Sequence, residues 1–152
     1  MKISMIVAMS SNRVIGIKNQ LPWKLSGDMA WFKKQTMNKI MLLGRKTWES
    51  LPIRPLPGRE HIILSQNKNY MPLSVSGDKL KSIHVVNTVD KALETARKIA
   101  QELLLKKEGL TEQSELMVIG GATIYQLLLP LCDKLYITRV KADFSGDAWF
   151  PE

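Results

Sequence analysis

Two apolar runs of this sequence end at glycine and continue into segments that predict a helix, a junction suited to binding phosphate. The first is Gly44-Arg45-Lys46-Thr47, which adds two cations and a hydroxyl group, and the second is Gly120-Gly121-Ala122-Thr123. The first turn of a helix exposes unpaired N–H groups and the positive end of its dipole, and glycine lets a ligand approach the backbone closely. Neither junction is a six-position dinucleotide fingerprint or a Walker loop, and a glycine after a strand is most often an ordinary turn. Each junction taken alone is therefore a weak signal.

Asp28 is a second candidate, in the first turn of a helix expected over residues 26–36. Carboxylates are common at this position because they interact favourably with the helix dipole. Trp31 and Phe32 follow three and four residues later, so helical spacing turns the carboxylate towards apolar side chains. A carboxylate in that setting needs a partner to offset its desolvation, and a ligand with two adjacent N–H donors provides one. The helix-end interpretation and the ligand-binding interpretation both stand at this point.

Arg54 and Arg59 are a third candidate pair. They flank Pro55-Leu56-Pro57-Gly58, and the two prolines restrict the backbone of this short connection. Arginines on the surface usually have no specific role, but a stiff loop favours their presentation to a ligand.

The elements that must position these residues alternate between strand and helix. Apolar runs predict strands over 3–9, 39–44, 61–65, 82–86, 115–121 and 134–140. Helical spacing predicts helices over 26–36, from about residue 45 to before Pro52, from 88 to about 107, and over 122–130. Residues 10–25 and 66–82 are expected to be irregular. This order predicts an α/β fold with a mostly parallel central sheet flanked by helices on both faces.

Composition agrees with one globular domain over residues 1–152. The net charge of +8 favours anionic partners, but the basic residues are scattered, so we expect a small anionic molecule and no nucleic acid. No apolar stretch has the length of a membrane span, and no membrane partner is expected. The single cysteine, Cys132, permits no internal disulfide and no metal cluster, which favours a reducing cytoplasm.

The motifs LPWKLSGDMAWFK, GRKTWESL, RPLPGR, HIILS, MVIGGATIY and LYITRV, in this order, resemble those of the dihydrofolate reductases. The similarity runs in register over nearly the whole chain and is weakest over 66–82 and 100–114. LPW followed five residues later by an aspartate, together with GRKTWES, is the most specific part. An aspartate at position 28, where animal members carry glutamate, is typical of the bacterial type.

The resemblance implies reduction of 7,8-dihydrofolate to tetrahydrofolate by hydride transfer to pterin C6 with protonation at N5. The reacting centre would include Leu21, Trp23, Asp28 and Tyr125. Asp28, assisted by Thr138, would accept hydrogen bonds from the ring N3–H and the 2-amino group and favour protonation at N5. Arg59 would pair with the α-carboxylate of the glutamate tail. The substrate site would comprise Ile6, Asp28, Met29, Phe32, Lys33, Leu51, Arg54, Leu56, Arg59, Ile119 and Thr138.

The same resemblance implies NADPH as the cofactor, bound across the carboxyl ends of the strands. Residues 10–24 would act as a lid, Gly120 to Leu127 would cradle the diphosphate, and the Gly120–Gly121 peptide bond would be cis. Arg45, Lys46 and Thr47 would favour NADPH over NADH. The cofactor site would comprise Ala8, Val14, Ile15, Gly16, Ile17, Lys18, Asn19, Gln20, Gly44, Arg45, Lys46, Thr47, Ser65, Gln66, Asn87, Gly120, Gly121, Ala122, Thr123, Ile124, Tyr125, Gln126 and Leu127.

Two departures from the family pattern stand out. Thr123 replaces an arginine of some bacterial members. The sequence also ends at Glu152, where family members continue for roughly thirty residues into an antiparallel hairpin that completes the sheet. We therefore expect an apolar edge at 134–140. Either the sequence is incomplete at its C-terminus, or another chain covers this edge, or the fold is a fragment, and we favour the first.

Partners implied by the resemblance are dihydrofolate and antifolate inhibitors, with the protein acting as a monomer and without a metal ion. Two other functions remain open from sequence alone. One is a related pyrimidine reductase of riboflavin synthesis, which has no need of LPW, Asp28 or Arg59. The other is a nucleotide-binding module without catalytic activity.

Overall fold

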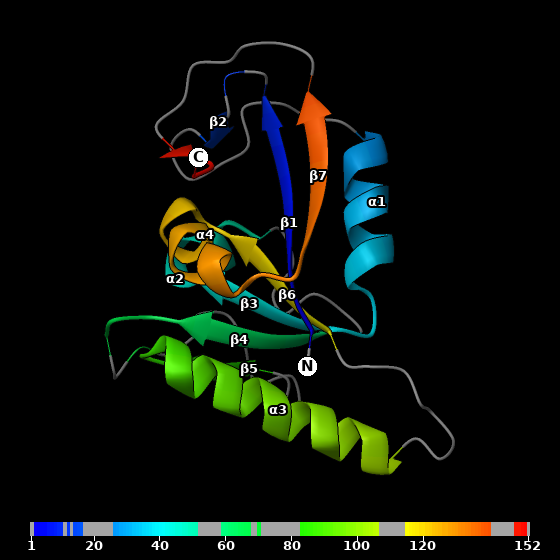
Figure 1. The fold of residues 1–152 in the computed structure, drawn as a ribbon, viewed down its shortest axis with the longest axis vertical. Helices are drawn as coiled ribbons and strands as arrows, with labels where there is room; N and C mark the ends of the chain where they lie inside the picture. The colour runs from blue at the N-terminus through cyan, green and yellow to red at the C-terminus, as the bar shows by residue number, and fades with distance from the viewer. Residues whose placement is uncertain are drawn as a thin grey trace.

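A six-stranded sheet, parallel throughout, forms the centre of the computed structural model (Figure 1). The structure describes residues 2–10, 12, 14–16, 26–51, 59–67, 70, 83–106, 115–140 and 148–151; at positions 10, 14, 16, 26–30, 103–106, 138–140 and 148 it describes the backbone alone. The strand order is β5-β4-β3-β6-β1-β7. The strands are β1 (Lys2–Ser10), β3 (Ile40–Gly44), β4 (Glu60–Leu64), β5 (Ile83–Val86), β6 (Glu115–Gly120) and β7 (Lys134–Val140).

Helices lie on both faces of this sheet, as the sequence predicts. One face is covered by α3 (Val89–Lys106) and α4 (Ala122–Leu128), which share a core cluster with β1, β3, β4 and β6. The other face is covered by α2 (Arg45–Ser50), whose Trp48 packs with Leu43 and Ile63, and by α1 (Ser26–Thr36), which runs beside β7 (Figure 1). The α/β architecture is therefore confirmed.

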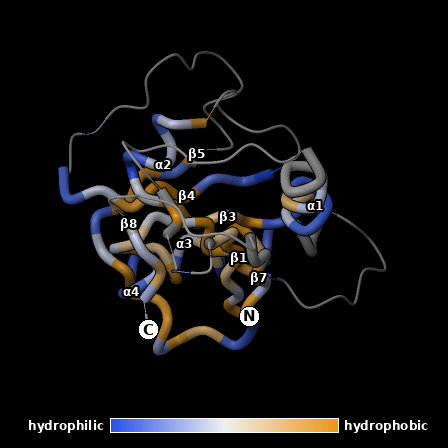
Figure 2. The backbone as a smooth tube through the Cα atoms, turned by 90° about the horizontal axis from the view of Figure 1, so that it is seen from above, coloured by the Kyte–Doolittle hydropathy of each residue, from blue (hydrophilic) through white to orange (hydrophobic). Residues whose placement is uncertain are grey.

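The central strands are buried on both faces, which explains why they read as continuous apolar runs. In β3, the residues Ile40 to Leu43 are at most 2% exposed. Figure 2 shows this hydrophobic centre, with more hydrophilic segments towards the outside. Such strands need helices on both sides, because neither face is polar enough to meet water.

Element boundaries agree with the sequence prediction to within a few residues, with two differences. A two-stranded antiparallel sheet joins β2 (Val14–Gly16) to β8 (Ala148–Trp149), whereas residues 10–25 were expected to be irregular. These strands are too short to carry an alternating pattern. In addition, α4 ends at Leu128 and a 3₁₀ turn, η2 (Leu129–Leu131), follows, because Pro130 has no N–H to continue the α-helix.

Candidate active site

The two glycine junctions of the sequence lie side by side at the carboxyl ends of neighbouring strands. β3 pairs with β6 so that Leu43 aligns with Gly120, and each strand turns directly into a helix. A Cβ atom at Gly44 would lie 3.9 Å from the carbonyl oxygen of Gly120, and one at Gly121 would lie 3.4 Å from Thr47 Oγ1. The Gly120–Gly121 peptide bond is cis, as expected, and Gly120 has φ of 120°, a conformation that favours glycine. The space beside these glycines is filled from within the protein, since a Cβ atom would lie 3.2 Å from Ile124 Cγ1 at Gly44 and 3.2 Å from the Tyr125 hydroxyl at Gly120. The lack of side chains therefore lets the two junctions pack closely against each other and against α4.

Cationic and hydroxyl groups surround these junctions. Lys46 is exposed, and the partly exposed Arg45 lies with its guanidinium carbon 5.9 Å from the centre of the Tyr70 ring. Arg45 Nη1 also donates to Glu49 Oε1 at 2.7 Å, one helical turn further along α2. Among the described residues, no side chain caps the first turn of α2 or of α4. Accessible N–H groups and cations at adjacent glycines fit a phosphate-bearing ligand.

The hydroxyl of Tyr125 connects α4 to two strands at this same edge. It lies 2.7 Å from the carbonyl oxygen of Ile6 in β1 and 2.9 Å from that of Ile119 in β6. A tyrosine hydroxyl has one proton, so it donates to one of these carbonyls at a time. Burial raises the pKa of the Tyr125 hydroxyl, which keeps it a neutral donor. Ile6 and Ile119 both belong to the substrate site that the resemblance implies.

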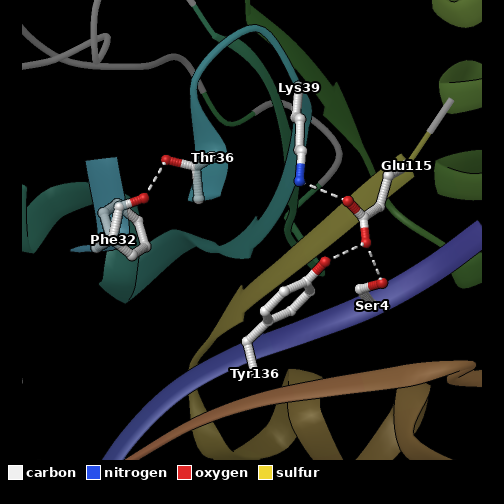
Figure 3. A network of polar contacts seen from close by, with 6 residues as sticks. All are labelled: Ser4, Phe32, Thr36, Lys39, Glu115 and Tyr136. Carbon is white, nitrogen blue, oxygen red and sulfur yellow. Dashed lines mark hydrogen bonds and ion pairs between the residues drawn. The ribbon is translucent and has the colours of Figure 1, made fainter. Parts of the chain in front are cut away.

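Arg59 is held at the carboxyl end of α1. Although it is an arginine, it is only 8% exposed, and its Nη1 donates to Thr36 Oγ1 at 3.1 Å. The Thr36 hydroxyl donates in turn to the carbonyl oxygen of Phe32 at 2.8 Å (Figure 3). Burial lowers the pKa of the Arg59 guanidinium. A buried guanidinium with a restricted orientation suits binding of a carboxylate.

Helix α1 carries the residue expected to hold the pterin ring. Asp28 lies in its first turn, and α1 runs antiparallel to β7 (Figure 1). Trp31 meets Tyr136 of β7 edge to face, with ring centres 6.2 Å apart. Position 28 lies about 4.5 Å before Trp31 along the helix, and position 138 lies about 6.6 Å beyond Tyr136 along the strand. The backbone therefore brings positions 28 and 138 towards the carboxyl end of the sheet, where the glycine junctions lie.

Other residues predicted from the sequence are distributed around this edge. Leu51 and Ile119 pack against the cluster of Leu43, Trp48 and Ile63. Ala8 pairs with Thr138 in the sheet, and Asn87 follows β5. Buried positions of the predicted set are Ile6, Arg59, Ser65, Gly120, Ile124 and Tyr125; half-buried ones are Ala8, Ile15, Phe32, Gly44, Arg45, Thr47, Leu51, Asn87, Ile119, Gly121 and Ala122; exposed ones are Lys33, Lys46, Gln66, Thr123, Gln126 and Leu127.

Part of the predicted site lies outside the residues that the structure describes. Leu21, Trp23, Arg54, Leu56 and residues 17–20 are not among the described residues. The side chains of Val14, Asp28, Met29 and Thr138 are likewise not described, although their backbone is, and Gly16 is described by its backbone.

Several residues at the site were missed by sequence reasoning. Thr36 fastens Arg59, and Glu49 and Tyr70 hold Arg45. Glu49 could have been found, because it stands four residues after Arg45 on a predicted helix. Thr36 and Tyr70 carry no local signal, since their contacts join segments distant in the sequence.

No group of three histidine, cysteine, aspartate or glutamate side chains in the described part of the chain is placed to hold a metal ion. Nor does that part contain a helix long and apolar enough to cross a membrane.

Comparison with known proteins gives one family. The family model described as dihydrofolate reductase matches residues 2–152. A dihydrofolate reductase of Buchnera aphidicola subsp. Baizongia pistaciae is 40% identical, over 99% of this chain and 78% of the relative. That of Buchnera aphidicola subsp. Acyrthosiphon pisum is 39% identical and that of Neisseria gonorrhoeae 36% identical, each over 100% of this chain and 80% of the relative.

A solved structure of the same family is similar to this chain over nearly its whole length. Dihydrofolate reductase from Enterococcus faecalis, complexed with NADP(H) and the compound RAB-propyl, superimposes with a TM-score of 0.79 at 30% sequence identity. The match covers 99% of this chain and 77% of that one. The similarity therefore extends over the whole described sheet and the helices around it.

Proposed function

This chain belongs to the dihydrofolate reductase family, and from that membership we propose how its residues divide the work of the reaction. The protein is an NADPH-dependent oxidoreductase that reduces 7,8-dihydrofolate to tetrahydrofolate. The finer assignment concerns three groups of residues, one for the pterin ring, one for the glutamate tail and one for the cofactor.

Asp28 holds the pterin ring in this proposal, with help from Thr138. Its carboxylate accepts hydrogen bonds from the ring N3–H and the 2-amino group. A negative charge in an apolar pocket also favours a proton at N5, with a water molecule as the direct donor, and hydride adds readily to C6 only when N5 is protonated. The position of Asp28 in the first turn of α1, one turn before Trp31, supports this role.

Arg59 binds the α-carboxylate of the glutamate tail, with Arg54 at its edge. Support comes from its burial and from the contact with Thr36, which together restrict the guanidinium to few orientations. A guanidinium so restricted loses little further entropy when it forms a bidentate contact with a carboxylate. Apolar residues of the same face, Leu51 and Ile119 among them, line the ring and benzoyl site.

NADPH, when bound, supplies the hydride. The close packing of Gly44, Gly120 and Gly121 would bring the N-termini of α2 and α4 together at its diphosphate, and Arg45 and Lys46 would neutralise the 2′-phosphate. Tyr125 keeps β1, β6 and α4 joined beside the nicotinamide. Residues 10–24 exclude water from the reacting atoms in this proposal.

One observation carries the proposal. The two glycine junctions meet at the carboxyl end of the sheet, and α1 brings position 28 towards the same end. Asp28→Asn tests it. We expect this variant to lose most of its turnover at neutral pH, by a factor of about 100 or more, and to keep its affinity for NADPH. The measurement is the loss of nicotinamide absorbance with dihydrofolate, and competition by a diaminopyrimidine antifolate checks the site. Wild-type turnover in Asp28→Asn would remove Asp28 from this role.

We further propose that the protein acts as a monomer in the cytoplasm. Its single cysteine, Cys132, supports a reducing compartment. Sedimentation of the purified chain measures the oligomeric state, and a stable dimer would refute that part of the proposal.

A further inference from the structure

We propose that Glu115 and Tyr136 are positioning residues for the pterin site, because together they fix helix α1 against the sheet. The inference rests on the proposed function, in which α1 carries Asp28 and ends beside Arg59. Neither Glu115 nor Tyr136 belongs to the site predicted from the sequence, and both lie nearer the opposite, amino-terminal end of their strands.

The carboxylate of Glu115 joins four segments of the chain (Figure 3). One oxygen accepts from Lys39 Nζ at 2.5 Å, just before β3. The other accepts from Ser4 Oγ of β1 at 2.5 Å and from the Tyr136 hydroxyl of β7 at 3.1 Å. Because Glu115 is only 11% exposed, these bonds are largely shielded from water.

Tyr136 links this cluster to α1. Its hydroxyl is held by Glu115, and its ring makes a T-shaped contact with the ring of Trp31, with ring centres 6.2 Å apart at 62°. Lys134 Nζ lies 4.3 Å and Lys39 Nζ 5.7 Å from the centre of the same ring. The ring is therefore held by its hydroxyl and by its faces, and Trp31 packs against a fixed surface.

The end of α1 depends on the same carboxylate. Lys39 follows the last residue of the helix, Thr36, by three positions, and the Thr36 hydroxyl donates to the carbonyl oxygen of Phe32 (Figure 3). Thr36 also accepts a hydrogen bond from Arg59. Glu115 thus restrains α1 at its side through Tyr136 and beyond its end through Lys39. The helix needs such restraint, because its sequence SGDMAWFKKQT lacks the continuous apolar stripe seen in α3.

The position of α1 on β7 matters for function. A helix that slides or tilts on β7 moves Asp28 and the Thr36–Arg59 contact relative to the glycine junctions, which are anchored in β3 and β6. A misplacement of about 1 Å can weaken a reaction by as much as 100-fold. Loosening the Glu115 cluster should therefore weaken the binding of dihydrofolate and leave the cofactor side nearly unchanged.

Two substitutions test this inference. Glu115→Gln keeps the size of the side chain but removes the charge that holds Lys39, and Trp31→Phe leaves the Glu115 cluster intact but reduces the ring contact. We expect both to raise the Kd and the KM for dihydrofolate by about tenfold, with the Kd for NADPH changed by less than about twofold. Binding is followed by protein fluorescence, so the readout does not depend on turnover.

Two control variants separate position from stability. Ile99→Val truncates the core beneath α3, away from α1, and Glu94→Gln removes an exposed carboxylate of α3. Ile99→Val should lower the midpoint of urea denaturation without changing the Kd for dihydrofolate, and Glu94→Gln should change neither.

Unchanged dihydrofolate binding in Glu115→Gln and Trp31→Phe, with lower stability alone, would overturn the inference, as would equal weakening of dihydrofolate and NADPH. Its failure is distinct from that of the proposed function. Full turnover in Asp28→Asn refutes the role of Asp28, whereas the binding results for Glu115→Gln decide the positioning role by themselves.

Discussion

The guanidinium of Arg59 donates to the hydroxyl of Thr36 at 3.1 Å, across 23 positions of the sequence. The contact joins the last residue of α1 to the residue that precedes β4, and it is buried. It makes the orientation of Arg59 depend on α1, the helix that also carries Asp28. In the proposed function, the ring and the glutamate tail of the substrate would therefore both depend on α1 and on its contact with Arg59.

Thr36→Val removes this hydroxyl and keeps the shape of the side chain. We expect the free energy of unfolding to fall by about 1–2 kcal/mol, since a hydrogen bond to a charged group is lost. The KM for dihydrofolate should rise about fivefold, while that for a pterin without the glutamate stays unchanged. Thr36→Ser is the control, because it retains the hydroxyl. An equal loss for both substrates, in this variant and in Arg59→Ala, would contradict the assignment of Arg59 to the α-carboxylate.

Glu49 is expected to moderate cofactor preference through Arg45. Its carboxylate lies 2.7 Å from Arg45 Nη1 and reduces the positive charge offered to a 2′-phosphate. Both side chains are partly exposed, so the pair contributes at most about 1 kcal/mol to stability. Glu49→Gln should strengthen NADPH binding about two- to fivefold at low salt, with NADH unaffected.

The opposite substitution provides the check on this prediction. Arg45→Ala should narrow the difference in affinity between NADPH and NADH, because one cation facing the 2′-phosphate is lost. Fluorescence titration with both cofactors measures the ratio. If the ratio stays constant in both variants, the 2′-phosphate binds elsewhere.

The larger elements of this fold were predictable because each has a signal within its own sequence. The run KIMLLG ends at Gly44, and the structure has β3 over Ile40–Gly44 and a helix directly after it. The pair β2 and β8 was not predictable, since its strands are short and their partners lie more than 130 positions apart. Their existence depends on tertiary pairing and not on local pattern.

The residues of the candidate site also fall into those with a local sequence signal and those that depend on tertiary contacts. The glycine junctions, Asp28 and Arg59 are site candidates that local motifs in the sequence indicate, and their roles in the reaction stay predictions. Contacts such as Tyr125 to Ile6, 119 positions apart, arise only when β1 and β6 pair and α4 packs on them. Glu115 was read simply as the first residue of a strand, and its bonds to three other segments have no counterpart in local spacing.

Tyr125→Phe is expected to destabilise the folded protein without disturbing the ring packing against Phe150, which lies 5.1 Å away between centres. The carbonyl oxygens of Ile6 and Ile119 lose their shared donor, and we expect the unfolding free energy to fall by about 1–3 kcal/mol. Because burial raises the pKa of the Tyr125 hydroxyl, the folded state keeps a proton that the unfolded chain releases above its ordinary pKa of 10.0. Wild-type stability should then fall as pH rises above that value.

Urea denaturation at neutral and alkaline pH measures both effects. The difference in unfolding free energy between wild type and Tyr125→Phe should be constant below about pH 10 and shrink above it. A difference that persists undiminished into strong alkali would show that the Tyr125 hydroxyl does not titrate with unfolding.

For Glu115→Gln, the difference in unfolding free energy from wild type should depend on pH at the acidic end of the range. Burial by itself raises the pKa of the Glu115 carboxyl, but hydrogen bonds from Lys39, Ser4 and Tyr136 and the charge of Lys39 outweigh it, so the pKa lies below its ordinary 4.5. A lowered pKa in the folded state means that the carboxylate stabilises the protein above pH 4.5, and that this stabilisation is lost as pH falls through the lower, folded-state value.

Wild type should therefore exceed Glu115→Gln in stability at neutral pH, and the difference should narrow on acidification. Urea denaturation of both proteins across this range provides the measurement. A gap of equal size at neutral and acid pH would mean that Lys39, Ser4 and Tyr136 do not stabilise the charged form of Glu115.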